Sequence, residues 1–197
     1  MFVGRERELA TLERLYRSDA FQMPVVYGRR RVGKTSLIVE FVKGKPAIFF
    51  SARESTAKEN LVALSQAIAD LRLDGTPVAS DTAAPVFASF EEAFTHVFML
   101  AQQQRIVFVI DEFPYLAQSD RSVSSVLQHL IDRHKEGSRL FLILCGSSMS
   151  FMEHQVLGYK SPLYGRRTAQ IKVQPFDIMQ ASLLLSGSSS EDIVTWY

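Results

Sequence analysis

Four short runs of apolar residues and one alternating segment predict the strands of a β-sheet. The four runs contain almost no polar residue, which is typical of strands that are buried on both faces. In the fifth segment Ala169, Ile171 and Val173 alternate with polar residues, as they would in a half-exposed edge strand. The five segments are residues 23–27, 46–50, 106–110, 140–144 and 169–173.

Between these segments, apolar residues recur every three or four positions, which is typical of one face of a helix. Alternation of strands and helices predicts an α/β fold, a three-layer sandwich with a five-stranded, mostly parallel sheet. Residues 74–89 are rich in Ala, Pro, Ser, Thr and Asp and are expected to form a long loop. The helical stripes lie within residues 5–16, 35–42, 61–71, 90–101 and 123–131.

Composition restricts the possible functions only slightly. The 197 residues are 47% hydrophobic and 22% charged, as in an ordinary globular domain, and the net charge of +1 does not point to nucleic acid or an anionic membrane. Cys145 is the only cysteine, so an internal disulfide is excluded and a reducing, cytoplasmic location is expected. The four histidines show no metal-ligand spacing, and no apolar stretch reaches the roughly 20 residues of a membrane span.

Residues 28–35 carry the most specific chemistry. They fit the pattern G-x-x-x-x-G-K-[ST], and they lie between a predicted strand and a predicted helix, as a phosphate-binding loop requires. In such a loop the backbone N–H groups surround the β-phosphate, Lys34 reaches the β- and γ-phosphates, and Thr35 binds Mg²⁺. The three arginines of the loop either contact phosphate or lie solvated on its outer side. The predicted nucleotide-binding residues are Gly28, Arg29, Arg30, Arg31, Val32, Gly33, Lys34, Thr35 and Ser36.

Two acids end the third predicted strand. Asp111 is expected beside the Mg²⁺, which it would hold through water. Glu112 is expected to point away from Asp111, toward the space beyond the γ-phosphate, where a carboxylate can orient and deprotonate a water. This pair favours hydrolysis of the nucleotide over transfer of phosphate to another acceptor.

Two later pairs of residues have more than one interpretation. Ser147 or Ser148, after the fourth strand, could hydrogen-bond the attacking water or could cap a helix that begins at Met149. Arg166 and Arg167 precede the edge strand and are either solvated or an arginine finger that reaches the γ-phosphate bound by a neighbouring subunit.

Five motifs occur in a fixed order along the chain: residues 2–6 (FVGRE), the phosphate loop, residues 111–116 (DEFPYL), residues 145–148 (CGSS) and residues 162–167 (PLYGRR). In this arrangement the chain resembles the prokaryotic AAA+-related P-loop ATPases, specifically the archaeal-type group placed within the STAND NTPases. The resemblance implies that Val3 and Gly4 line an adenine site and that Ser147 is the polar sensor. It also implies ATP and Mg²⁺ as ligands, and Arg166 or Arg167 as a finger between subunits.

The resemblance further implies a division of the chain. Residues 1–175 correspond to the ATPase core, and residues 176–197 to the start of a helical lid that is expected to be truncated, with weak binding and slow turnover as a result. Family members continue into a winged-helix region, so DNA or a protein is a possible partner through regions outside this chain. Three functions remain: an ATP hydrolase that couples nucleotide state to conformational change, a nucleotide-gated switch with little turnover, and a small-molecule kinase.

Overall fold

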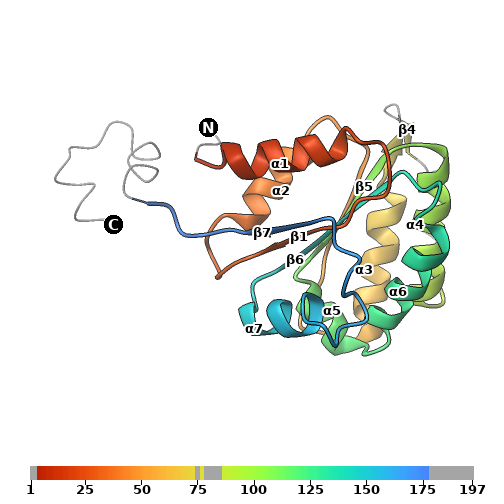
Figure 1. Ribbon diagram of the computed structural model, residues 1–197. Coiled ribbons are helices and arrows are strands. Elements are labelled where there is room, and N and C mark those ends of the chain that lie inside the picture. The colour runs from red at the N-terminus through yellow and green to blue at the C-terminus, as the bar shows by residue number, and fades with distance from the viewer. Residues whose placement is uncertain (1–3, 74–75, 78–85, 178–197) are drawn as a thin grey trace.

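The computed structural model describes residues 4–73, 76–77 and 86–177, and these form a three-layer α/β sandwich (Figure 1). The central sheet has five strands in the order β2-β5-β6-β1-β7, and every pair is parallel. The predicted fold class is therefore confirmed, with a sheet that is parallel throughout. The strands are β1 (Pro24–Tyr27), β2 (Ala47–Ser51), β5 (Ile106–Asp111), β6 (Leu140–Gly146) and β7 (Ala169–Lys172).

Helices cover both faces of the sheet and divide its apolar side chains into two clusters. On one face, α1 (Glu6–Tyr16) and α2 (Lys34–Val42) pack on side chains such as Val26, Val107 and Ile143. On the other face, the side chains of β5 and β6 that alternate with these pack against three longer helices. These are α3 (Ala57–Ala69), α4 (Phe90–Gln103) and α6 (Val123–His134).

Two short helical segments follow β5 and β6 at the carboxyl edge of the sheet. These are α5 (Phe113–Ser119) and α7 (Met149–Phe151), and α7 continues into a π-helical turn at Met152–Val156. Neither was predicted as a helix from periodicity, because each is too short to repeat a hydrophobic pattern. Both matter for function, since they begin directly after the predicted acidic pair and the predicted serines.

The prediction that residues 46–50 are buried on both faces was wrong. β2 lies at the edge of the sheet, and only Ile48 and Phe50 are fully buried, whereas Ala47 and Phe49 are half-buried. An edge strand has a neighbour on one side only, so its side chains receive less cover. The opposite edge is β7, where Ile171 is buried between exposed Gln170 and Lys172, as the alternating pattern predicted.

Other predictions concern segments that the structure describes only in part. In the expected loop at residues 74–89, Thr76–Pro77 (β4) pairs with Arg72–Leu73 (β3) as a short antiparallel hairpin. Of the helical lid expected at residues 176–197, only residues 176–177 are described, and they are not helical. The rest of the predicted lid, like Val3, lies outside the described residues. Among the described residues, no helix is long and apolar enough to cross a membrane.

Gly28 allows the start of the phosphate loop to pass close to the end of β7, and its replacement by Ala tests this packing. A Cβ at position 28 would lie 2.3 Å from the carbonyl oxygen of Val173, whose N–H donates to Tyr27 O. We expect Gly28→Ala to lower the free energy of unfolding by about 3 kcal/mol, because backbone on both sides must move.

Gly137→Ala is the control for this substitution. Gly137 has φ +84° but no atom within 4 Å of an added Cβ, so it reports only the cost of the left-handed backbone, about 1 kcal/mol. Urea unfolding of both variants measures the difference. Equal losses would show that the close approach at Gly28 does not matter.

Candidate functional site

The carboxyl ends of β1, β5 and β6 bring the predicted phosphate loop, acidic pair and serines to one edge of the sheet. The loop joins β1 to α2, and α2 begins at Lys34 directly after Gly33. Gly33 has φ +86° and no atom within 4 Å of an added Cβ, so glycine serves here for its backbone angle and not for space. No side chain caps this helix start, which leaves its N–H groups available to an anion.

Lys34 lies inside the loop, with a side chain that is almost fully buried. Its Nζ donates to the carbonyl oxygens of Gly28 (3.0 Å) and Arg29 (2.8 Å). These neutral acceptors occupy positions where a phosphate oxygen would be a stronger partner, because a charged acceptor roughly doubles the strength of such a bond. The Lys34 ammonium is therefore already positioned inside the loop, where it could bind a phosphate oxygen.

Thr35 and Asp111 meet although they are 76 positions apart in the chain. The Thr35 hydroxyl donates to Asp111 Oδ2 at 3.1 Å, and the N–H of Glu112 donates to Asp111 Oδ1 at 3.0 Å. A hydroxyl and a carboxylate are the hard oxygen ligands that Mg²⁺ prefers, so this pair fits the predicted metal position. The described residues contain no cluster of three or more His, Cys, Asp or Glu side chains that could hold a metal ion.

Glu112 adopts a left-handed conformation (φ +52°, ψ +46°) immediately before α5. This turn, and not strand alternation alone, separates its carboxylate from that of Asp111. Its Oε2 accepts hydrogen bonds from Ser147 N (3.1 Å) and from the Ser147 hydroxyl (2.9 Å). A non-glycine residue with positive φ carries strain, and such strain is concentrated at functional sites.

The structure distinguishes the two candidate serines. Ser147 faces the acidic pair, whereas Ser148 stands at the N-cap position of α7 and its side chain makes no capping bond. Ser147 is therefore the serine that the fold brings to Glu112. Neighbouring Cys145 is buried, as predicted, and burial together with the Asp111 carboxylate raises the pKa of its thiol well above the usual value.

A cavity of about 520 Å³ opens over the phosphate loop. Its walls include Arg30, Arg31 and Glu112, so two of the three loop arginines face the site even though they are exposed. Tyr115 also lines it, and its hydroxyl accepts a hydrogen bond from Arg30 Nη2 at 2.5 Å. Sequence reasoning assigned no role to Tyr115, although it lies in the motif at residues 111–116, one turn after Asp111.

Gly4 lies away from the lining of this cavity, beside the chain that leaves β7. It has φ +79°, its N–H donates to Glu6 Oε1 at 3.1 Å, and an added Cβ would lie 3.0 Å from the Phe176 ring. Its predicted contact with adenine remains a prediction.

Arg166 and Arg167 have different environments. Arg166 forms a two-pronged ion pair with Asp132 of α6, with Nε 2.9 Å from Oδ1, and also donates to the carbonyl of Pro162 at 2.8 Å. Arg167 makes one long bond, 3.4 Å to the carbonyl of Leu157, and its guanidinium lies 5.8 Å from the centre of the Tyr164 ring. Arg166 thus anchors its segment to α6, whereas Arg167 is held loosely.

The Asp132–Arg166 pair predicts a dependence of stability on pH. The hydrogen bond from Arg166 is the main reason that the pKa of Asp132 lies below 3.8, its ordinary value. An acid with a lowered pKa stabilises the fold above its unfolded pKa and loses this contribution as pH falls through the folded pKa. We expect Asp132→Asn to cost less than about 1 kcal/mol near pH 7, because the pair is partly exposed.

Urea unfolding as a function of pH measures this contribution. The difference between wild type and Asp132→Asn should be constant down to about pH 5 and should shrink below the unfolded pKa of 3.8. In the Arg166→Ala background, Asp132→Asn should have little effect at any pH. A difference that persists unchanged at pH 3 would refute the ion-pair explanation.

Comparison with known proteins also identifies an ATPase domain. A model of ATPase domains found predominantly in Archaea matches residues 2–193. An uncharacterized protein of Methanocaldococcus jannaschii is 32% identical over all 197 residues, and the chain spans only 41% of that relative's length. An uncharacterized ATP-binding protein of the same organism is 49% identical over 45 residues, which are 23% of this chain and 76% of that protein.

Solved structures share the fold. The Walker-type ATPase of Pyrococcus abyssi superposes with a TM-score of 0.69 at 24% identity, over 97% of this chain and 61% of that chain. The Aeropyrum pernix ORC2 protein, solved as ADPNP and ADP complexes, gives a TM-score of 0.64 at 19% identity, over 92% of this chain and 50% of that chain. The family model covers nearly the whole chain and agrees with the predicted resemblance to archaeal-type ATPases, so the chain belongs to the family of ATPase domains found predominantly in Archaea.

Proposed function

We propose that this chain hydrolyses ATP in a Mg²⁺-dependent reaction and couples the state of the nucleotide to a change in its own conformation. The observation that carries the proposal is the pairing of two carboxylates with different partners. Asp111 is bonded to Thr35 of the loop, whereas Glu112 is bonded to Ser147 at the end of β6. Two adjacent acids are thereby given two roles, one at the metal and one at the attacking water.

The chain supplies the parts that phosphoryl transfer needs. The N–H groups at the start of α2 and the Lys34 ammonium bind the phosphates, and Ser36 and Val32 complete the loop around them. Mg²⁺ at Thr35 and Asp111 would neutralise charge on the β- and γ-phosphates. Glu112 orients a water and takes its proton, a function that requires the carboxylate within hydrogen-bond reach of that water.

Ser147 connects the reaction to the conformation of the chain. Its hydroxyl donates to Glu112 and would turn to a γ-phosphate oxygen when ATP is bound. Glu112 would then be free to hydrogen-bond the water. Helices α5 and α7, which begin beside Glu112 and Ser147, would move in response.

A nucleotide-gated switch of the STAND type, with little turnover, is the second candidate. Lys34 and Glu112 both have partners within the chain, so a nucleotide must displace these bonds before it is bound productively. Competition between the nucleotide and these bonds within the chain favours long-lived nucleotide-bound states over rapid turnover.

We further propose that Val3 and Gly4 contact adenine, and that DNA or a protein partner is bound through regions beyond these 197 residues.

Glu112→Gln distinguishes hydrolysis from switching. The amide keeps the size of the side chain but cannot accept a proton, so we expect ATP turnover to fall about 100-fold or more with binding of fluorescent ATP retained. Lys34→Ala should lose binding itself. Ser147→Ala should reduce turnover about tenfold or more, whereas Ser148→Ala, with its side chain outside the site, should not.

Measurement of phosphate release under saturating ATP, together with nucleotide titration, checks these expectations. Turnover in Glu112→Gln equal to that of wild type would remove Glu112 from the mechanism. Binding without measurable turnover in wild type would favour the switch.

A finger between subunits is assigned to Arg167 rather than to Arg166, because Asp132 already holds Arg166. We expect the specific activity of wild type to rise with protein concentration and that of Arg167→Ala to stay low, with a loss on the order of 1000-fold. Arg166→Ala should lower thermal stability but keep the rise with concentration. Activity that is independent of concentration in all three proteins would contradict a finger.

A further inference from the structure

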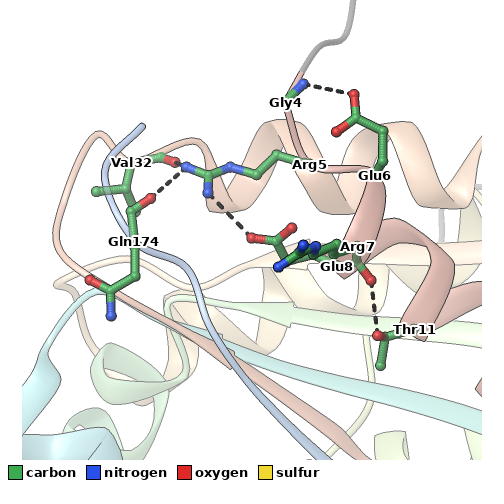
Figure 2. A network of polar contacts seen from close by, with 8 residues as sticks. All are labelled: Gly4, Arg5, Glu6, Arg7, Glu8, Thr11, Val32 and Gln174. Atoms are coloured by element: carbon green, nitrogen blue, oxygen red, sulfur yellow. Dashed lines mark hydrogen bonds and ion pairs between the residues drawn. The ribbon is translucent and has the colours of Figure 1, made fainter. Parts of the chain in front are cut away.

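Arg5 carries a buried positive charge at the start of α1, outside the phosphate loop, and only 3% of the residue is exposed. Its Nη2 donates to two backbone carbonyls, Val32 O at 2.9 Å and Gln174 O at 2.6 Å, and its Nη1 lies 3.3 Å from Glu8 Oε1. Figure 2 shows the Arg5 side chain extending from just before α1 to the carbonyl groups of Val32 and Gln174. One guanidinium nitrogen therefore joins the phosphate loop to the chain that leaves β7.

The contact with Val32 determines the direction of a neighbouring N–H group. A trans peptide is planar, so its C=O and N–H point in opposite directions. Because the carbonyl of Val32 points to Arg5, the N–H of Gly33 points away from Arg5, and Gly33 lines the phosphate cavity. Gly33 has the backbone freedom to let this peptide rotate, so an external donor is needed to fix it.

The contact with Gln174 extends the same network to the segment after β7. The Arg5 guanidinium also lies over the ring of Phe176, with 4.1 Å between Cζ and the ring centre. A cation held over an aromatic ring and bonded to two carbonyls restrains all three partners together. A shift of residues 174–176 would therefore move Arg5 and, through it, Val32.

We infer that Arg5 is a positioning residue that holds the phosphate loop in its anion-binding conformation and couples it to the chain at residues 174–176. The inference rests on the proposed nucleotide binding, and it adds a residue that acts through Val32 and Gln174 without touching the nucleotide. Burial of a charge costs free energy unless the group is fully paired, and the Nε of Arg5 has no hydrogen-bond partner.

Arg105 offers a matched control within the same chain. It is also buried, it also donates to backbone carbonyls of separate segments (Ala20, Arg139 and Leu15), and its Nε likewise has no partner. It precedes β5 at the amino edge of the sheet, away from the phosphate loop. A purely structural effect of losing a buried arginine should appear equally in both positions.

The binding experiment compares Arg5→Lys and Arg5→Ala with Arg105→Lys and Arg105→Ala. With Mg²⁺ and fluorescent ADP, at a temperature where circular dichroism shows each protein folded, we expect Arg5→Lys to weaken binding about tenfold or more. Arg105→Lys should remain within about twofold of wild type, since it does not contact the loop. Equal affinities in the two lysine variants would overturn the inference.

Hydrogen exchange tests the coupling without any nucleotide. In the nucleotide-free protein, Arg5→Lys should speed exchange of the amides of residues 29–34 and of residues 173–177 together, whereas Arg105→Lys should speed neither. Faster exchange in only one of the two segments would contradict the coupling. If an Arg5 variant does not fold, wild-type protein still gives an answer: ADP must slow exchange in both segments, and no effect at 173–177 refutes the coupling.

Failure of the proposed function has a different result from failure of this inference. If wild type and Lys34→Ala bind ADP equally, or neither binds, nucleotide binding at this loop is wrong, whereas the exchange pattern of nucleotide-free Arg5→Lys still decides whether Arg5 positions the loop.

Discussion

The parallel alignment of β1, β5 and β6 is the constraint on which the rest of the site depends. In a parallel sheet the carboxyl ends of the strands lie at one edge, so residues that are far apart in the sequence come close together there. Val26 pairs with Cys145 and Ile110 with Leu144. With this register Thr35 reaches Asp111, and Ser147 reaches Glu112. Apolar side chains on both faces of the sheet pack against the helices and hold the strands in place. The geometry of the site therefore depends on the packing of the core.

At this edge of the sheet, each charged group of the site has a neutral hydrogen-bond partner within the chain. Lys34 is bonded to loop carbonyls, Asp111 to Thr35 and Glu112 to Ser147, so no charge is left buried without a partner among these three. An unpaired buried charge would cost several kcal/mol, which explains why the charged side chains of the site are hydrogen-bonded to groups of the same chain. In the proposed function, a nucleotide would exchange these hydrogen bonds for others, and the bond between Ser147 and Glu112 is the one that lies beside both α5 and α7.

The sequence predicted the sheet and the identity of the loop well, because both depend on local patterns. All five strands lie where the apolar runs placed them, and Gly28 to Thr35 form the turn between β1 and α2. Other features depend on tertiary neighbours and could not be read from the chain. The partial exposure of β2 follows from its edge position, and the distinction between Arg166 and Arg167 depends on Asp132, more than 30 positions away. Tyr115 and the left-handed turn at Glu112 were missed because a helix of one or two turns leaves no periodicity.

Two residues beside the phosphate cavity have strained backbone conformations, and neighbouring contacts hold them in place. Arg31 and Glu112 are two of the three non-glycine residues with positive φ in the described part of the chain, and both border the phosphate cavity. A conformation of this kind costs about 1–3 kcal/mol at each residue and persists only where surrounding contacts determine it. Ser147 supplies such a contact for Glu112, and Arg5 supplies one for the loop through Val32. The conformation of the loop therefore depends on a residue outside the sequence motif: the buried guanidinium of Arg5, directly before α1, bonds both the loop at Val32 and the carbonyl of Gln174.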